Sequence, residues 1–144
     1  VDPKILRAVL AVNEIQPHRL VSLLEKKTGT LSGKRIAILG LAFKDNTDDI
    51  RDSRAITVIR ELLHKGANVS AYDPMAVSNM KQIFPEIQYY SCAADALAGS
   101  DGCLVMTEWP EFSRLGKEFD LMAHRVIIEG RRILTCKGAD GICW

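Results

Sequence analysis

The chain has no apolar run approaching the roughly 20 residues that a membrane-spanning helix needs, and no signal-peptide pattern opens it. It also has no excess of charge, because 19 basic side chains against 18 acidic ones leave a net charge of +1. Proteins that bind nucleic acids or membrane surfaces electrostatically usually carry a clear basic excess. We therefore expect a cytoplasmic protein that binds neither nucleic acid nor membrane.

The four cysteines lack the spacing of a metal site. No two of them form a C-x-x-C pair, and the three histidines lie far from them in sequence, so zinc binding is not expected. Cys103 lies in an apolar run and is expected to be a small buried hydrophobe. Cys136 and Cys143 could pair, but reduced thiols are the usual state in the cytoplasm. Neither has a histidine close by in sequence, so no catalytic nucleophile and no metal site are predicted.

What the sequence does contain is a regular alternation of strand-like and helix-like segments. Its 144 residues are 47% hydrophobic and 26% charged, the composition of one ordinary globular domain. The alternation predicts an α/β fold, a doubly wound and mostly parallel Rossmann-like sheet preceded by a long N-terminal helix. The expected strands are residues 36–39, 68–72, 87–90, 103–106 and 126–128. The expected helices that follow the first lie between Ser53 and Gly66 and at residues 75–84, 93–98 and 116–124.

The opening helix is unusually long for a small domain. Pro17 interrupts its apolar pattern, so either the helix kinks there or two helices meet near Gln16. The average helix has about 11–12 residues. The much longer opening helix is therefore expected to cover a partner subunit or another domain. The alternative is a helix packed only on its own sheet. Three segments are expected: a dimerisation helix at 1–30, an α/β domain at 31–134 and an irregular tail at 135–144.

The stretch that organises the chain is residues 40–53, which we call the 40–53 loop. It follows the first buried strand and is expected at the carboxyl edge of the sheet, where open α/β sheets bind ligands. It occupies the place of a dinucleotide-binding turn, but Ala42 stands where the second glycine of G-x-G-x-x-G lets the backbone approach a pyrophosphate. Phe43 and Lys44 instead offer an aromatic face and a mobile charge, which suit a base or sugar and a phosphate. A phosphate ligand is predicted, and standard NAD binding by this turn is not.

A cluster of charges ends the same loop. Asp48, Asp49, Arg51 and Asp52 come just before the expected helix start behind Ser53. They could form a capping network, since acidic groups stabilise a helix N-terminus. An arginine held by neighbouring carboxylates is also a well-oriented clamp for phosphate. The two interpretations are compatible.

Other polar and aromatic residues are expected near this edge. Asp73 ends the second strand, where Rossmann domains place a ribose-binding acid, although an Asp-Pro turn explains it equally well. Arg131 and Arg132 follow the last strand, and since adjacent side chains point in different directions, one could face the cleft while the other is solvated. Trp109 and Phe112 could line a pocket, but core packing is the favoured interpretation.

Residues 40–53 read Gly-Leu-Ala-Phe-Lys-Asp-Asn-Thr-Asp-Asp-Ile-Arg-Asp-Ser, which closely resembles the signature loop of the C-terminal, UDP-binding domain of UDP-glucose/GDP-mannose dehydrogenases. Other landmarks of that family follow in the right order. They are Val-Asn-Glu at 12–14 with Gln-Pro at 16–17, Gly-Ala-Asn-Val-Ser-Ala-Tyr-Asp-Pro at 66–74, Thr-Glu-Trp-Pro-Glu-Phe at 107–112 and Gly-Arg at 130–131. The resemblance extends from about residue 3 to about residue 134.

The resemblance implies part of an enzyme that oxidises the C6 alcohol of a nucleotide sugar to a carboxylate in two NAD-dependent steps. In that family an N-terminal Rossmann domain binds NAD and carries the catalytic cysteine and its lysine partner, and a central helix forms much of the dimer interface. The C-terminal domain binds the nucleotide part of the substrate. Carried over by position, Phe43 and Lys44 would contact the UDP-sugar, and Arg131 would contact the substrate in a pattern that can extend across the dimer. Arg51 would reach NAD across the domain cleft.

The chain also departs from the family pattern. It contains neither G-x-G-x-x-G nor a segment resembling the catalytic-cysteine loop, so we expect it to be an inactive part of the enzyme, as an expressed fragment or a natural truncation. Arg54 stands where the family often has proline. The leading hypothesis is a domain that binds a UDP- or GDP-linked sugar. The alternatives are a homodimerisation module with an incidental cleft and a standalone NAD-binding protein, against which Ala42 argues.

Overall fold

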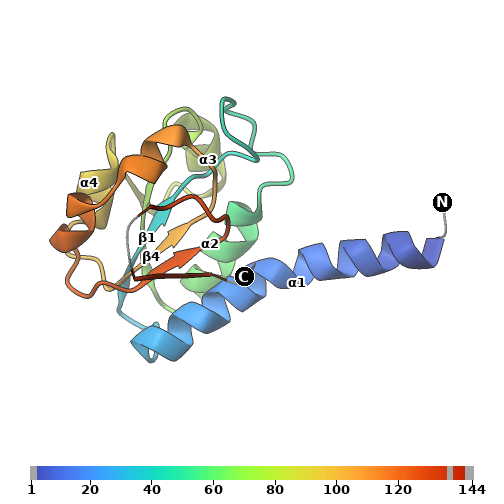
Figure 1. Cartoon of the computed structure of the whole chain (residues 1–144), viewed down its shortest axis with the longest axis horizontal. Coiled ribbons are helices and arrows are strands. Elements are labelled where there is room, and N and C mark those ends of the chain that lie inside the picture. The colour runs from blue at the N-terminus through green and yellow to red at the C-terminus, as the bar shows by residue number, and fades with distance from the viewer. Residues whose placement is uncertain (1–2, 136–137, 142–144) are drawn as a thin grey trace.

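The computed structural model describes residues 3–135 and 138–141, whose strands form one six-stranded sheet (Figure 1). Neighbouring strands are all parallel, in the order β3-β2-β1-β4-β5-β6. The chain moves outward from β1 to β3 and then returns to the other side of β1, which confirms the expected doubly wound, Rossmann-like fold. The strands are β1 (Arg35–Leu39), β2 (Asn68–Tyr72), β3 (Gln88–Tyr89), β4 (Gly102–Val105), β5 (Ile127–Glu129) and β6 (Ala139–Gly141).

Helices cover both faces of the sheet. α1 (Pro3–Thr28) and α2 (Arg54–His64) pack together on one face, and α4 (Ala93–Leu97) packs with the 3-10 helix η2 (Lys117–Leu121) on the other (Figure 1). The remaining elements are α3 (Val77–Ile83) and the 3-10 helix η1 (Pro110–Arg114). Since residues 116–124 were expected to be helical, η2 is a shorter and tighter version of that element. Among the described residues, no helix is long and apolar enough to cross a membrane.

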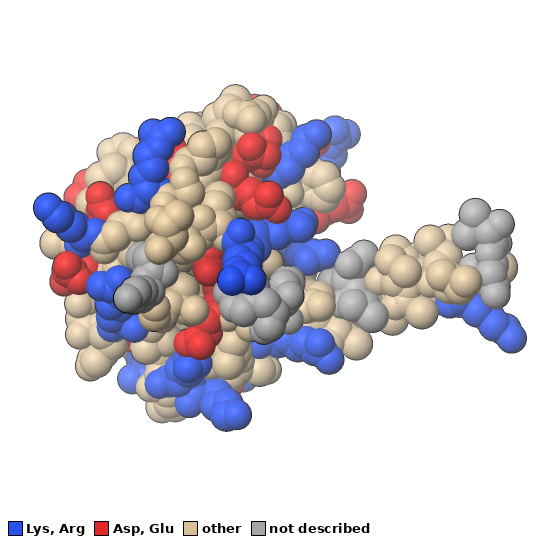
Figure 2. Space-filling view, viewed as in Figure 1, with Lys and Arg blue, Asp and Glu red and all other residues tan. Residues whose placement is uncertain are grey.

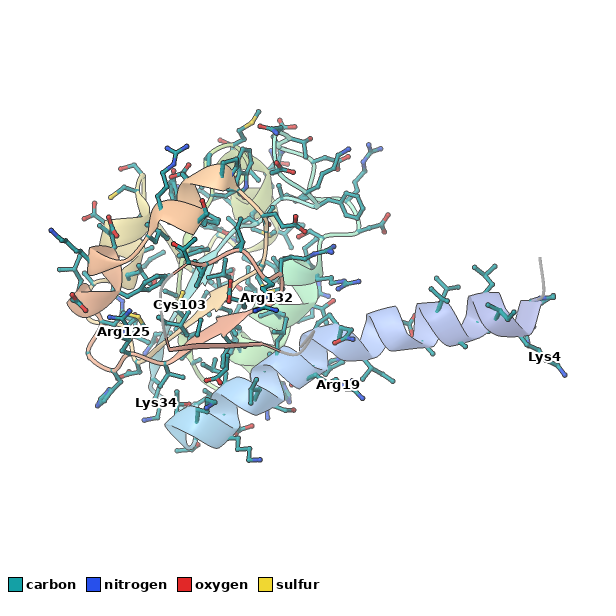
Figure 3. The ribbon with its side chains drawn as sticks, viewed as in Figure 1. Lys4, Arg19, Lys34, Cys103, Arg125 and Arg132 are labelled. Atoms are coloured by element: carbon teal, nitrogen blue, oxygen red, sulfur yellow. The ribbon has the colours of Figure 1, made fainter. Side chains whose placement is uncertain are left out.

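The centre of the sheet is apolar because both of its faces are covered. Residues 36–39 of β1 are all fully buried, and so is Cys103 in β4, which lies within the sheet in Figure 3. Gly102 lies directly under α1, where an added Cβ would come within 2.7 Å of the Leu24 side chain. A glycine at this position therefore lets the helix approach the sheet closely.

α1 is one helix across Pro17, so two helices do not meet near Gln16. We call residues 17–28 its inner half and residues 3–16 its projecting half. The inner half packs on β4 and β5 through Leu20, Val21 and Leu24, all buried. The projecting half extends away from the body (Figure 1), with Lys4 near its tip and Arg19 just beyond the point where the helix meets the body (Figure 3).

The projecting half presents an apolar surface. Its large exposed apolar side chains have between 50% and 63% of their area accessible; they are Ile5, Leu6, Val9, Leu10 and Ile15. Figure 2 shows few charged side chains on the visible face of this half apart from the tip. An apolar stripe of this extent on an exposed half-helix is typical of an interaction surface.

The end of the chain differs from the expected irregular tail. Ala139–Gly141 form β6, which adds a parallel strand beside β5, and Lys27 of α1 pairs with Asp140 at 2.9 Å. The segment has no apolar alternation, so its strand is specified by the open edge of β5 rather than by its own side chains. Cys136 and Cys143, whose pairing the sequence left open, lie outside the described residues.

Candidate functional site

The turn after β1 is held by hydrogen bonds on every side. Gly40 has a left-handed φ of 96°, and an added Cβ would lie 2.6 Å from Thr107, so both the conformation and the space require glycine. The Thr107 hydroxyl donates to the carbonyl of Ala42 at 3.0 Å, and the Ser53 hydroxyl donates to the carbonyl of Leu41 at 2.7 Å. These contacts fix the backbone that leads into Phe43.

Asp73 supplies the hydrogen-bond acceptors for the backbone N–H groups of this turn. Asp73 is buried, with only 3% of the residue accessible, and its Oδ2 accepts the backbone N–H groups of Leu41 at 2.7 Å and Ala42 at 3.1 Å. Oδ1 accepts the N–H groups of Met75 and Ala76, both at 2.8 Å. The two hydrogen bonds from Met75 and Ala76 form the Asp-Pro turn that the sequence suggested. The bonds to Leu41 and Ala42 join two loops that the sequence did not connect.

Phe43, Lys44 and Arg131 line one hollow of about 250 Å³ at the carboxyl edge, together with Met106 and Glu108. Phe43 is 54% exposed although it is a large aromatic side chain. Arg131 pairs with Glu108 at 3.5 Å, and because both side chains are about half exposed, that pair contributes little and leaves Arg131 available to an anion. The structure thus brings together the three residues predicted to contact substrate.

Two more hollows adjoin this one. The first, about 240 Å³, shares Phe43, Met106 and Arg131 with it and adds Arg54. The second, about 700 Å³, runs from Phe43 and Arg54 to Leu10 on α1. We call these three hollows the Phe43 groove. Of the two adjacent arginines, Arg131 lines the groove, whereas Arg132 lies near the last strands and does not line these hollows (Figure 3).

Sequence reasoning did not assign several residues of the groove. Arg54 was noted only as a departure from the family pattern, and Met106 and Glu108 received no role. Asp52, which also lines the groove, has a left-handed φ of 59°, as does Asn46 at 58°. Asparagine and aspartate tolerate this conformation best after glycine, so their presence in the 40–53 loop was a signal for its sharp turns.

Arg51 lies apart from the Phe43 groove. It lines a separate open hollow of about 740 Å³ with Asn79 and Ile83, and Asn79 donates to the carbonyl of Asp48 at 2.8 Å. Arg51 holds Asp49 through Nε and Nη2 at 2.8–3.2 Å while 88% of its side chain stays accessible. Hydrogen bonds from Arg51 lower the pKa of Asp49 to about 2, and the same bonds raise the pKa of Arg51.

The helix start beside it is also capped. Ser53 accepts the N–H of Ala55 at 3.3 Å, which confirms the prediction that it is the N-cap of α2. In the charged cluster, Asp49 accepts the backbone N–H of Arg51 and thus bonds within the loop. The Asp49–Arg51 pair is a separate contact within the loop. It orients a guanidinium toward solvent, as the clamp interpretation requires.

Trp109 and Phe112 belong to the core, as favoured from the sequence. Trp109 is 6% exposed and its indole N–H donates to Asp73 Oδ2 at 3.0 Å. Phe112 is fully buried and meets the Tyr72 ring edge-on, with centroids 6.2 Å apart. Burial, with a hydrogen bond to Glu111, raises the pKa of Tyr72 to about 12. Trp109 and Phe112 therefore act as buried residues that support Asp73 and Tyr72 at the end of β2.

No group of three or more metal-ligating side chains gathers among the described residues. Cys103 is a fully buried thiol, which agrees with its expected role as a small hydrophobe, and Cys92 is a thiol of intermediate burial.

Residues 37–136 match the family model for the UDP binding domain of the UDP-glucose/GDP-mannose dehydrogenase family. The match covers most of β1 and all of β2 to β5 with the segments between them, and β6 lies beyond it. The chain belongs to this family. α1 lies outside the matched region, although relatives align with it as well.

Three relatives illustrate the similarity. The UDP-glucose 6-dehydrogenase AglM of Haloferax volcanii is 53% identical over 134 residues, which are 93% of this chain and 31% of that protein. The UDP-glucose 6-dehydrogenase TuaD of Bacillus subtilis is 38% identical over 92% of this chain and 29% of its own length. The solved structure of a UDP-glucose dehydrogenase from Pyrobaculum islandicum superimposes with a TM-score of 0.87 at 36% identity, covering 96% of this chain and 32% of that one. The chain thus spans about a third of the length of the relatives it matches.

Proposed function

We propose that this chain is the nucleotide-sugar-binding part of an NAD-dependent nucleotide-sugar 6-dehydrogenase. Such an enzyme oxidises the sugar C6 alcohol to an aldehyde and then, with an oxygen atom from water, to a carboxylate, and one hydride passes to NAD and protons are released in each step. The observation that carries the proposal is the meeting of Phe43, Lys44 and Arg131 around one hollow in a chain of this family. We further propose a cytoplasmic location, in keeping with the sequence-based expectation.

The chemistry of the Phe43 groove suits a nucleoside diphosphate. The exposed ring of Phe43 provides a face on which a base or sugar can stack. Lys44 and Arg131 supply two positive charges, and a guanidinium can hold two phosphate oxygens at once. Arg54, which lines the adjoining hollow with Phe43 and Arg131, adds a third positive charge. The relatives' names favour UDP as the nucleotide, and GDP remains the second candidate.

NAD has a different relation to this chain. The turn after β1 does not fit its pyrophosphate, since the N–H groups of Leu41 and Ala42 are both bonded to Asp73. Arg51 is the residue that we propose reaches NAD bound elsewhere in the enzyme, because its guanidinium is oriented by Asp49 and faces solvent. When bound, NAD supplies the hydride acceptor, and none of the chain's residues is proposed to take part in the hydride transfer itself.

Thermal unfolding with added nucleotide tests the substrate proposal. UDP at a hundred times its dissociation constant should stabilise the folded chain by about 2.7 kcal/mol, a rise of several degrees in Tm for a domain of this size. Lys44→Ala and Arg131→Ala should each abolish most of the rise. Arg51→Gln should leave it unchanged, because Arg51 lies on a separate hollow.

Lys34→Ala is the matched charge control. Lys34 precedes β1 at the amino end of the sheet, away from the groove (Figure 3), so its loss should leave the UDP-dependent rise intact. Comparison of UDP with GDP at equal concentration identifies the base. If neither nucleotide changes Tm while the chain is folded, the groove is not a nucleotide site in this chain and the substrate proposal fails.

A second function is favoured by the projecting half of α1. We propose that its apolar stripe pairs with a second copy of the chain, which gives a homodimer. Leu6 and Leu10 are 52% and 53% exposed, and a helix with such a stripe is expected to bury it against a partner. The two proposed surfaces adjoin, since Leu10 also lines the far end of the Phe43 groove.

Sedimentation equilibrium measures this second function directly. The wild-type chain should have the mass of two copies, and the double variant Leu6→Glu with Leu10→Glu should have the mass of one. Leu121→Glu is the matched control, because Leu121 is also a leucine at 50% exposure but lies on η2, on the opposite face of the sheet. A wild-type chain that sediments as a single copy at all concentrations up to saturation would rule out the pairing.

A further inference from the structure

The Asp73 carboxylate is the most heavily bonded buried charge at the carboxyl edge. Five N–H groups reach it, four from the backbone of Leu41, Ala42, Met75 and Ala76 and one from the indole of Trp109, all at 2.7–3.1 Å. No ion pair to Asp73 is found in the described part of the chain. Its negative charge is therefore stabilised by N–H dipoles alone, which is how protein backbones bind anions.

The position of these donors is informative. In dinucleotide-binding domains the backbone N–H groups after the first strand hold the pyrophosphate. Here the equivalent turn follows β1, and its N–H groups at Leu41 and Ala42 both point to Asp73 Oδ2. The next N–H, that of Phe43, donates to the carbonyl of Asp49 at 2.7 Å. The turn consequently offers none of these three donors to an external phosphate.

We propose that Asp73 is a built-in anion that takes the place of the dinucleotide phosphate, and that it is the positioning residue for the Phe43 groove. It closes the turn to a pyrophosphate and fixes the backbone from Leu41 to Ala42, so that Phe43 and Lys44 project toward a different ligand. This inference rests on the proposed function for the identity of that ligand. The anion-binding character of the turn does not depend on it.

A neutral side chain of the same shape cannot replace this carboxylate. In Asp73→Asn the amide has one oxygen and one NH₂ group, so at least two of the five donors would face another donor. A buried N–H left without an acceptor is unfavourable, and the turn would open. The requirement is therefore for an anion, which distinguishes this role from ordinary packing.

Chemical rescue by a small carboxylate tests the proposal. Asp73→Ala should lower Tm by several degrees, and formate should restore part of that loss, whereas chloride at the same ionic strength should not. UDP affinity should fall about tenfold or more, as expected for lost hydrogen bonds to a charged group, and formate should raise it again. Asp101→Ala is the matched control, because Asp101 also accepts a backbone N–H, from Arg35 at 3.0 Å, but lies at the amino end of the sheet. Its loss should leave UDP affinity unchanged.

Asp73→Asn covers the case in which Asp73→Ala does not fold. Amide hydrogen exchange at Leu41 and Ala42 should accelerate in this variant, while the exchange of Ile38 in β1 stays slow. The proposal is overturned if Asp73→Asn keeps both slow exchange and wild-type UDP affinity, or if folded Asp73→Ala responds equally to formate and chloride. The formate effect on Tm is measured without nucleotide, so a wild-type chain that fails to bind UDP would refute the substrate proposal and leave this test intact.

Discussion

The two halves of α1 have similar apolar patterns and opposite environments. In the inner half, Leu20, Val21 and Leu24 are at most 2% exposed against β4 and β5. In the projecting half, Leu6 and Leu10 remain more than half exposed. The comparison shows that an apolar helical stripe specifies a surface to be covered, but it does not specify whether the covering surface belongs to the same chain.

The 40–53 loop is divided in the same way. Its backbone near Leu41 and Ala42 is satisfied within the domain by Asp73, Ser53 and Thr107. Its side chains at Phe43 and Arg51 extend into hollows and remain exposed. A rigid backbone that presents accessible side chains is the arrangement expected of a binding loop on an ordered scaffold.

Leucine truncations in the two halves of α1 give the largest expected contrast. Leu24→Ala removes a fully buried side chain and should lower the free energy of unfolding by about 2–5 kcal/mol. Leu10→Ala should change it by less than about 0.5 kcal/mol in the monomer. Urea unfolding at a protein concentration that keeps the chain monomeric measures both. Equal losses would mean that the projecting half is packed against the body in solution.

Removal of the Ser53 hydroxyl should have an intermediate effect. Ser53→Ala loses both the cap of α2 and the bond to the Leu41 carbonyl, and we expect it to reduce the free energy of unfolding by about 1–2 kcal/mol. Ser113→Ala is the control, since the Ser113 hydroxyl donates to the carbonyl of Pro110 at an exposed site. Surface substitutions usually change the free energy of unfolding by less than about 0.5 kcal/mol, so we expect a loss in that range. Similar losses in the two variants would show that the backbone of the 40–53 loop is not specially anchored.

The exposed Asp49–Arg51 pair of the 40–53 loop should have the smallest effect on stability, and that effect depends on pH. The pKa of Asp49 lies at about 2 instead of its ordinary 3.8 because Arg51 donates to the charged carboxylate. A lowered folded-state pKa stabilises the protein above pH 3.8, and that contribution is lost as the pH falls toward 2. Carboxyl-carbon NMR titration should show the low pKa, and Arg51→Gln should return it toward 3.8. A wild-type value near 3.8 would mean that the pair does not persist and that Arg51 is not oriented in advance.

Local patterns were sufficient for most elements of the fold. β2 occupies residues 68–72 as expected, and β1 and α2 differ from expectation by a residue or so at their ends. β6 was missed because Asp140 and its neighbours carry no apolar alternation and pair only where β5 leaves an edge open. The convergence of the carboxyl ends of parallel strands predicted that Lys44 and Arg131 share one edge of the sheet. The family resemblance, rather than topology, selected Phe43, Lys44 and Arg131 as substrate contacts. The contribution of Met106 and Arg54 required knowledge of how the loops lie against one another.

The sequence by itself determined the family, the parallel sheet and the place of the 40–53 loop, because periodicity and motif spacing are local properties of the chain. Only the tertiary structure decided what Asp73 does. The residue lies 32 positions from Leu41 and 36 from Trp109, and its hydrogen bonds to them exist only after β1, β2 and β4 have assembled. Hydrogen bonds require donor and acceptor within about 3 Å, so a role that depends on contacts between distant segments is fixed by the assembled sheet and leaves no pattern in the sequence.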